Sequence, residues 1–224
     1  METFRRIEKK YLLDSGQYLK MMEGIKDHVV DDRYSSSRIS SLYYDNEGFE
    51  LIRRSIEKPE YKEKLRVRSY ERPGRDSRVF VEMKKKFQGI VYKRRSRAKL
   101  DDVLNDIYTC TFEDEQVGRE IGYMLNCYGR LKPKIYIGCK RHSYVARDDE
   151  DLRITFDSDI CYRMDDLNMN ASEKDKSLTD KVVMELKAKQ ALPLWLSSLL
   201  DEVKAYPQGF SKVGNAYLKE LKGV

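Results

Sequence analysis

The chain has 224 residues, of which 37% are charged and 40% hydrophobic, and its 44 basic and 38 acidic residues leave a net charge of +6. This length suits one large domain with a real core, and the modest net charge favours focused basic sites over a basic tail. No stretch approaches the roughly 20 apolar residues of a membrane-spanning helix, and the first residues lack the apolar core of a signal peptide. We therefore expect a cytoplasmic protein without a membrane segment.

Cysteine and histidine usage argues against metal or nucleophile chemistry based on these residues. The four cysteines, Cys110, Cys127, Cys139 and Cys161, form no C-x-x-C pair, so they are predicted to be reduced and to act as small apolar fillers. The chain has only two histidines. Neither a His/Cys zinc site nor a Ser-His-Asp triad is expected.

The sequence of the first half of the chain predicts mainly strands and few helices. A strand runs from roughly Phe4 to Leu12, and a helix follows from Ser15, capped by Asp14 or Ser15, with an apolar stripe of Tyr18, Leu19, Met22 and Ile25. Next come a strand in "SSRISSLYYD" and a short helix or irregular link in "NEGFELIRRSI". The strands "KEKLRVRSY", "VFVEMKKK" and "IVYKRRSRAKL" are then joined by turns at "ERPGRDSR" and "FQG".

The second half adds helices and a second group of strands. Helices are predicted in "LDDVLNDIY" and "EDEQVGREIGYMLNCYG", strands in "KPKIYIGCKRHSYV", "LRITFDSDICYR" and "KVVMELKAK", a loop in "MDDLNMNASEKDKSLTD", and closing helices in "LPLWLSSLLDEVKAY" and "SKVGNAYLKELK". About eight strands, mostly in antiparallel hairpins with helices inserted between groups, indicate the α+β class. No glycine-rich phosphate loop is present, which argues against Rossmann and P-loop folds.

Strict alternation gives several strands one apolar and one cationic face. In "KEKLRVRSY", the lysines and arginines lie on one side of an extended chain, and Leu65 and Val67 lie on the other. The polar positions of six such segments are Lys62, Lys64, Arg66 and Arg68; Phe80, Glu82, Lys84 and Lys86; Arg153, Thr155, Asp157 and Asp159; Glu185 and Lys187; Arg6, Glu8 and Lys10; and Lys93, Arg95 and Arg97.

The repetition of this pattern bears on what the cationic faces are for. A single strand of this kind is explained by a sheet with one face in water, but six such strands weaken that explanation. If the sheet closes with its helices outside, the charged faces point into a barrel. An interior lined by about a dozen basic side chains needs water, counterions and, most naturally, a polyphosphate, because uncompensated buried charge is costly.

Several motifs together resemble a known superfamily. The E-x-K pairs (Glu8/Lys10, Glu82/Lys84, Glu185/Lys187), the K-x-R-x-R strand at Lys64–Arg68 and the late Ser211-Lys212 resemble the triphosphate tunnel metalloenzymes. Within that superfamily, "SLYYDN", "VFVEMK", "KPKIYIGCKRHSY" and "LRITFDSDI" resemble the VTC (vacuolar transporter chaperone) polyphosphate polymerase branch over nearly the whole chain. CYTH-type members often open with E-x-E-x-K. Arg6 stands at the first Glu position here, which suits the VTC branch better than the hydrolase branches.

The resemblance implies a single domain over residues 1–224, an eight-stranded antiparallel β-barrel (triphosphate tunnel) with helices packed outside, and polyphosphate synthesis from ATP. Arginine forks suit bidentate phosphate contacts, and lysines act as point charges. The implied catalytic residues are Lys10, Arg66, Arg68, Lys84, Arg141, Arg153, Lys187 and Lys212. The implied substrate-binding residues are Lys64, Lys93, Arg95 and Ser211, although the turn leaves Lys93, Arg94 and Arg95 as alternatives for one position. Ser211 is a candidate N-cap that would place Lys212 where a helix favours anions.

The resemblance also implies a metal ion. Glu185 matches the metal-binding glutamate of the family and would hold Mn²⁺ or Mg²⁺, with phosphate oxygens and water filling most of the shell. Weaker metal candidates are Glu8, Glu82, Asp157 and Asp159, whose alternative role is to pair with neighbouring cations. The tyrosines Tyr43, Tyr44, Tyr136 and Tyr144 are expected to pack under the helices, and stacking of one of them on the adenine of ATP is the alternative.

Two other functions remain open. An enzyme of the same fold could let water attack and act as a triphosphate hydrolase, but that reaction benefits from a positioned base, and the sequence offers no evident candidate. A non-catalytic module could bind polyphosphate or RNA through basic strands and tyrosines. Carboxylates on the same faces would repel a nucleic-acid backbone, so the expected partners are ATP and inorganic polyphosphate or triphosphate, without nucleic acid.

Overall fold

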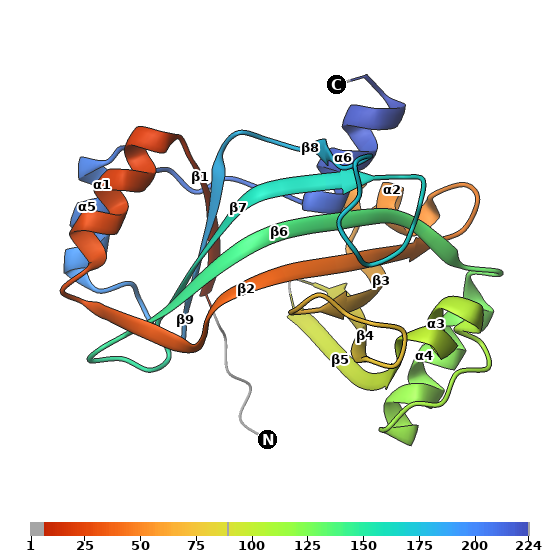
Figure 1. Ribbon diagram of the computed structural model, residues 1–224. Helices are drawn as coiled ribbons and strands as arrows, with labels where there is room; N and C mark the ends of the chain where they lie inside the picture. The colour runs from red at the N-terminus through yellow and green to blue at the C-terminus, as the bar shows by residue number, and fades with distance from the viewer. Residues whose placement is uncertain (1–6, 89, 224) are drawn as a thin grey trace. The chain divides into compact units, whose positions relative to one another are not determined.

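The computed structural model describes residues 7–88 and 90–223 of the chain (Figure 1). Nine strands lie within them: β1 Ile7–Leu13, β2 Val29–Asp45, β3 Tyr61–Ser69, β4 Arg78–Phe87, β5 Ile90–Lys99, β6 Lys132–Ala146, β7 Arg153–Arg163, β8 Lys176–Ser177 and β9 Val182–Ala188. The six helices are α1 Ser15–Ile25, α2 Glu50–Glu57, α3 Leu100–Asp106, α4 Glu115–Cys127, α5 Leu194–Glu202 and α6 Lys212–Leu221. The predicted beginning of the first strand, Phe4 to Arg6, falls outside the described residues.

The strands form one sheet with neighbours in the order β1-β9-β7-β6-β2-β3-β4-β5, and β8 pairs with β7 off this path. The pairs β1–β9, β7–β9, β2–β3, β3–β4 and β4–β5 are all antiparallel. The predicted α+β class with an antiparallel sheet is therefore confirmed, but the hydrogen-bonded order of the described strands ends at β1 and β5, so hydrogen bonds do not close the predicted barrel there. The two-residue β8 is an addition, inside a segment expected to be a loop.

The chain folds into two compact units, each built from separate stretches of sequence. Unit 1 consists of the described residues up to Ser37 together with Cys139–Ile160 and Thr179–Ser211. Unit 2 consists of Arg38–Gly138, Cys161–Leu178 and the described residues from Lys212 onward. The long strands β2, β6 and β7 contribute to both units, so each unit has its own part of the sheet.

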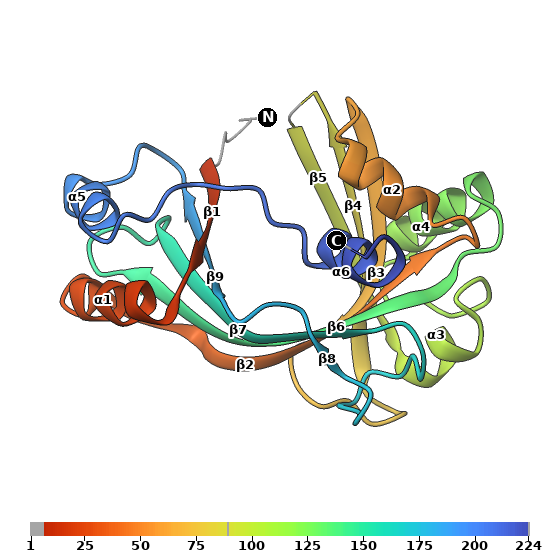
Figure 2. The ribbon, with the colours of Figure 1, turned by 90° about the horizontal axis from the view of Figure 1, so that it is seen from above.

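Unit 1 has its own apolar core between two helices and three strands. Helices α1 and α5 lie side by side and cover the apolar faces of β1, β7 and β9 (Figures 1 and 2). The strands contribute Tyr11, Leu13, Ile154, Phe156, Met184 and Leu186, and the helices contribute Met21, Ile25, Leu196 and Leu200. Burial of each such side chain stabilises the fold by about 1.5–3 kcal/mol. The apolar sides of these strands are thus covered by helices, as the alternation predicts.

Helix α1 begins where the sequence predicts, but its buried face differs from the predicted stripe. Asp14 is the N-cap, and its carboxylate accepts a hydrogen bond from the Gln17 backbone N–H at 2.8 Å while the Gln17 side chain returns one at 3.1 Å. The predicted stripe was wrong at Leu19, which is 67% exposed, whereas Met21 is fully buried. The helix ends at Ile25 because the chain enters β2 at Val29.

Unit 2 packs helices α3 and α4 on the apolar face of β3, β4 and β5 (Figure 2). Its core contains Leu65, Val67, Val79, Val81 and Met83 from the strands, with Val103, Val117, Ile121 and Met124 from the helices. Tyr44 and Tyr136 belong to this core, as predicted, and Tyr144 packs against the core of unit 1. Tyr43 is the exception among the four tyrosines, since it belongs to neither core.

Two charged residues organise loops in unit 2. The buried Asp45 carboxylate accepts hydrogen bonds from the backbone N–H groups of Leu51 and Ile52 at 3.0 and 2.8 Å, which anchors the start of α2. The fully buried Arg163 donates to the carbonyl oxygens of Asp166, Asn168 and Asn170 and pairs with Asp175. The predicted polar loop after β7 is therefore fixed around one guanidinium.

All four cysteines are free, and Cys139 is buried while Cys110 and Cys161 are partly buried. The filler prediction fails for Cys127, which is exposed at the end of α4. None of the helices within residues 7–88 and 90–223 has the length and apolar character needed to cross a membrane.

Candidate functional site

The polar faces of the strands form one ionic cluster in each unit. Directly opposed residues of antiparallel strands share a face, so the registers assign most of the members. The unit 1 ionic face consists of Glu8, Lys10, Arg141, Arg153, Thr155, Asp157, Glu185 and Lys187. The unit 2 ionic face consists of Ser41, Tyr43, Lys64, Arg66, Arg68, Glu82, Lys84, Lys93 and Arg95.

Glu185 is the centre of the unit 1 ionic face. Its Oε1 lies 2.7 Å from Lys187 Nζ, and its Oε2 lies 3.9 Å from Lys10 Nζ. Lys10 is also held by the Phe210 carbonyl oxygen at 3.3 Å. Burial opposes ionisation of this carboxyl, but Lys187, Lys10 and Arg141 outweigh it and lower the pKa of Glu185 to about 2. A partly buried carboxylate thus lies between two lysines whose side chains are about one third exposed.

The arginines of this face are also bound to carboxylates. Arg141 Nε and Nη2 donate to the two oxygens of the buried Asp157 at 2.6 and 2.7 Å, a bidentate pair. Arg153 lies opposite Lys187 in the β7–β9 register and is about half exposed, with Nη1 3.4 Å from Asp32 on β2. Arg141 is therefore rigidly held, and Arg153 is the more accessible of the two guanidinium groups.

The residues around Glu185 fit a metal ion held mainly by substrate. Among the described residues, no three His, Cys, Asp or Glu side chains gather closely enough to cage a metal. Magnesium commonly binds through one or two carboxylates plus phosphate oxygens. Glu185 is one such carboxylate, and Glu8, on the adjacent strand of the same face, is opposite Lys187. Thr155, directly opposite Glu185, has a buried hydroxyl without a hydrogen-bond partner in the described part of the chain. An orphaned hydroxyl at this position fits a polar group that binds beside Glu185.

Glu82 is the centre of the unit 2 ionic face and is almost fully buried. Arg66 Nε and Nη2 lie 2.7 and 2.6 Å from its Oε2, and Lys93 Nζ lies 2.6 Å from its Oε1. Arg68 Nε is 4.0 Å away. Burial raises the pKa of Glu82, but the three cations prevail and lower it to about 2. These contacts favour the cation-pairing role of Glu82 over its alternative as a metal ligand.

Tyr43 joins this face through the side chains of β3. Its hydroxyl accepts a hydrogen bond from Arg66 Nη1 at 3.1 Å, and the Arg66 guanidinium also lies 5.9 Å from its ring centre. Ser41, two residues earlier on β2, accepts from Arg68 Nε at 3.1 Å. The expectation that Tyr43 packs under a helix was wrong, because the register places it opposite Arg66 rather than opposite Leu65.

The β4–β5 register removes the ambiguity after the "FQG" turn. Lys93 lies opposite Lys84, and Arg95 lies opposite Glu82, so both belong to the ionic face. Arg94 points to the other face, where it forms two hydrogen bonds with Glu120 on α4 at 3.1 and 3.0 Å. The Arg95 guanidinium stacks over Phe80, 4.6 Å from its ring centre. Phe80, an aromatic residue on an otherwise polar face, thus makes a cation–π contact with Arg95.

The remaining predicted residues are placed as follows. Lys64 lies opposite Lys84 on the unit 2 ionic face. Lys212 is the first residue of α6, directly after Ser211, which agrees with the expected helix start. Asp159 has a left-handed backbone, with φ of 48°, so the alternation of β7 breaks before it. Its exposed carboxylate pairs with Lys140 at 2.8 Å, apart from the unit 1 ionic face.

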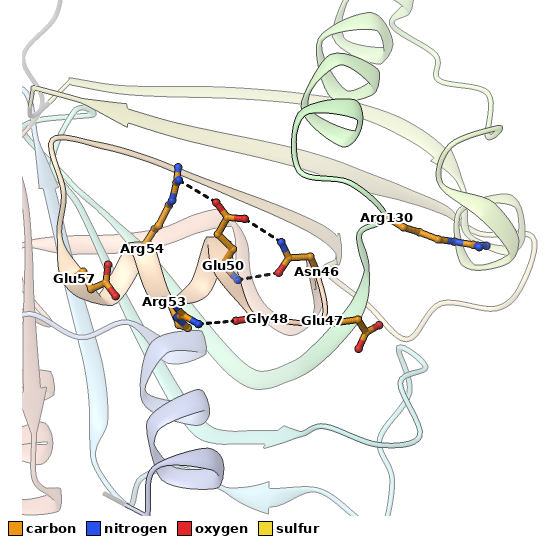
Figure 3. Close-up of a pocket in the computed structure, with 8 residues that line it drawn as sticks. All are labelled: Asn46, Glu47, Gly48, Glu50, Arg53, Arg54, Glu57 and Arg130. Atoms are coloured by element: carbon orange, nitrogen blue, oxygen red, sulfur yellow. Dashed lines mark hydrogen bonds and ion pairs between the residues drawn. The ribbon is translucent and has the colours of Figure 1, made fainter.

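A separate pocket of about 680 Å³ lies in unit 2 around the start of α2 (Figure 3). Its lining residues are Asn46, Glu47, Gly48, Glu50, Arg53, Arg54, Glu57 and Arg130, none of which belongs to an ionic face. Glu50 is bound by Asn46 and Arg54, at 3.1 and 3.0 Å, so its charge is already neutralised locally. We therefore assign the candidate function to the ionic faces and not to this pocket.

Comparison with solved structures supports the fold. A candidate adenylate cyclase from Bacillus halodurans gives a TM-score of 0.58 at 10% identity, with 96% of this chain and 97% of that chain covered. A candidate adenylate cyclase from Vibrio parahaemolyticus gives a TM-score of 0.47 at 10% identity, with 94% and 96% covered. At this identity the first likeness shows a common fold and nothing about activity. No curated protein is similar enough to count as a match.

A protein family, in contrast, matches almost the entire sequence. Residues 5–220 match the VTC domain family, which includes every residue of both ionic faces. Because the match extends over far more than half of the chain, it assigns the whole fold and not one motif. The chain belongs to the VTC domain family.

Proposed function

We propose that this protein is a metal-dependent polyphosphate polymerase, which transfers the γ-phosphate of ATP to the end of a growing polyphosphate chain. Membership of the VTC family supports a triphosphate-binding function related to polyphosphate. The observation that carries the proposal is that each unit presents cations arranged around one glutamate, the partly buried Glu185 or the buried Glu82, whose pKa these cations lower. The central glutamate reduces the repulsion between the cations. The face can therefore remain folded and still bind an anion with many oxygens.

Phosphoryl transfer requires alignment and charge neutralisation more than covalent assistance. On the unit 1 ionic face, Lys10, Lys187 and Arg153 are partly exposed, so these cations can meet phosphate oxygens at little cost in desolvation. Arg141 is fixed by two hydrogen bonds to Asp157 and keeps further N–H groups for a ligand. This division gives partly exposed lysines for neutralisation and a fixed arginine for orientation.

The metal would be held by Glu185 on the same face. Triphosphate tunnel metalloenzymes depend on a divalent metal, and we propose Mn²⁺ or Mg²⁺ for this protein. When bound, the metal would neutralise the oxygens of the transferred phosphoryl group. The lysine ion pairs keep Glu185 ionised at neutral pH, so its carboxylate is ready to bind a cation.

Incubation of the purified protein with ATP and either Mn²⁺ or Mg²⁺ tests the proposal, with products separated on a gel. The polymerase predicts long-chain polyphosphate, which disappears in Glu185→Gln while the circular dichroism spectrum is retained. Asp159→Asn is the matched control and is expected to remain active, because Asp159 lies apart from the unit 1 ionic face and pairs with Lys140. Orthophosphate as the sole product would instead identify a triphosphate hydrolase, and unimpaired Glu185→Gln would contradict the site.

A further inference from the structure

The guanidinium of Arg66, on the unit 2 ionic face, is held on two sides, by Tyr43 and by Glu82. Arg66 Nε and Nη2 are bound to Glu82, and Arg66 Nη1 donates to the Tyr43 hydroxyl. Tyr43 itself is only 7% exposed, so neither group can turn away into water. The orientation of the Arg66 guanidinium, and hence of its remaining N–H donors, therefore depends on Tyr43 as much as on Glu82.

The charges around Tyr43 are strongly biased toward cations. From β3, Arg66, Arg68 and Lys64 outweigh the burial of the phenol, which alone would raise its pKa, and they lower the pKa of Tyr43 to about 7. Glu82 on β4 is the nearby acidic group, and its charge is already matched by Arg66 and Lys93.

The charged groups of β6 and α2 in unit 2 are largely paired with one another, and none of them is among the groups that shift the pKa of Tyr43. On β6, Lys132 and Lys134 pair with Glu47 at 4.0 and 2.6 Å. On α2, Arg54 pairs with Glu50 at 3.0 Å. The cations of β3 are the charges that act on the Tyr43 hydroxyl.

We propose that Tyr43 is a positioning residue whose hydroxyl fixes Arg66 and whose proton loss cancels part of the positive charge that the unit 2 ionic face offers to an anion. The protonated phenol accepts from Arg66 and keeps its own O–H to donate. After the proton passes to solvent, the phenolate can only accept and forms an ion pair with Arg66. The inference deepens the proposed function, since it takes a phosphate chain as the anion.

The first test detects ionisation in the wild-type protein without any ligand. Tyrosinate has a distinct near-ultraviolet absorbance, and an ordinary tyrosine ionises near pH 10. We expect one tyrosinate to appear around pH 7 in the wild type and none in Tyr43→Phe. Tyr70→Phe is the matched control. Burial raises the pKa of Tyr70, but Arg68 and Lys93 outweigh it and lower this pKa, and Arg66 is not among the causes. This variant is expected to keep the step.

The second test measures binding of metal-free tripolyphosphate by calorimetry between about pH 6 and about pH 8.5, which brackets the ionisation. Tripolyphosphate gains charge over this range equally for every variant, so the ratio of wild-type to Tyr43→Phe affinity isolates Tyr43. We expect this ratio to fall by roughly tenfold as the pH rises, the size of one added charge near the ligand at a partly exposed site. The ratio for Tyr70→Phe is expected to stay nearly flat.

Absence of the absorbance step in the wild type would overturn the proposal whether or not the protein makes polyphosphate. A step together with a flat affinity ratio would overturn the link between Tyr43 and anion binding. Failure to form polymer from ATP would refute the proposed function and leave both of these measurements intact.

Discussion

At the scale of single residues, one central carboxylate per unit, Glu82 or Glu185, stabilises a dense group of cations. Neighbouring Lys and Arg side chains repel each other, and the repulsion grows as water is excluded. Glu82 offsets this repulsion by binding Arg66 and Lys93 directly and by lying close to Arg68. Glu185 does the same for Lys187 and Lys10. The glutamates of two E-x-K motifs, Glu82 and Glu185, therefore have an electrostatic role apart from any metal.

Glu82→Gln tests this role in the absence of substrate. The amide keeps the shape of the side chain but leaves three cations without their counterion, and loss of one partner of a buried ion pair costs about 3–5 kcal/mol. We expect the free energy of unfolding, from urea denaturation, to fall by that amount. The control Glu113→Gln, at a half-exposed carboxylate 3.6 Å from Arg78, should change it by less than about 1 kcal/mol. Equal effects of the two substitutions would contradict the electrostatic role.

Sequence reasoning found the charged members of the ionic faces, but it missed Ser41 and Tyr43 and did not give the pairing. Alternation assigns Arg66, Glu82 and Lys84 to one face, because a strand has a period of two. It cannot tell Tyr43 from Tyr44, since only the β2–β3 register puts one opposite Arg66 and the other opposite Leu65. The available signal for Tyr43 was that Ser41 and Tyr43 are two residues apart, as Arg66 and Arg68 are. The positive φ of Asp159 left no trace in the alternation pattern.

At the scale of elements, β6 must pass very close to β7 in unit 2. A Cβ atom added to Gly138 would lie 2.8 Å from Cys161 Sγ and 2.9 Å from the Tyr136 hydroxyl oxygen. The Tyr136 ring cannot yield easily, because the Arg163 guanidinium stacks 3.8 Å from its centre and fixes the following loop. The glycine is thus required by packing and not by backbone conformation.

Gly138→Ala is accordingly expected to destabilise the protein. Overpacking of a tight interior site costs about 1–3 kcal/mol, which a thermal melt would detect as a lower midpoint. Gly122→Ala in α4 is the matched control, since nothing lies within 4 Å of its added Cβ, and alanine there should stabilise the helix by up to about 1 kcal/mol. A Gly138→Ala protein as stable as the wild type would show that β6 and β7 can separate at little cost.

The helices and strands were largely predictable from the sequence. The exceptions depend on tertiary contacts. The hairpins β3–β4 and β4–β5 follow from alternation and turn residues, and the observed registers keep the expected faces. The segment after β7 was predicted as an irregular polar loop, but the buried Arg163 gives it a fixed structure. An arginine at a strand end gives no sign of such a role in the sequence, because its partners are backbone carbonyls.

At the scale of the whole molecule, the ionic faces couple stability to pH. Glu82 and Glu185 have pKa values of about 2, lower than the ordinary value of 4.5. The folded state therefore binds fewer protons than the unfolded state between these values. Their stabilisation is complete above the ordinary pKa and is lost as the pH falls toward 2.

We expect the free energy of unfolding to fall steeply between about pH 5 and about pH 2, by roughly 3 kcal/mol for each glutamate. Urea denaturation across this range measures the slope. Glu185→Gln should reduce the slope, because the neutral amide no longer titrates. A wild-type protein whose stability is flat in this range would contradict the ionised state of the two carboxylates.

The central claim is that the ionic faces bind triphosphate, and a charge-matched binding measurement tests it most directly. Tripolyphosphate affinity would be compared for the wild type, a Lys10→Gln/Lys187→Gln variant of the unit 1 ionic face, and a Lys20→Gln/Lys204→Gln variant at exposed positions away from it. We predict salt-sensitive binding by the wild type, a loss of tenfold or more in affinity for the first variant (about 1.4 kcal/mol per tenfold), and little change for the second. Equal losses in both variants, or no binding by the wild type, would contradict the account.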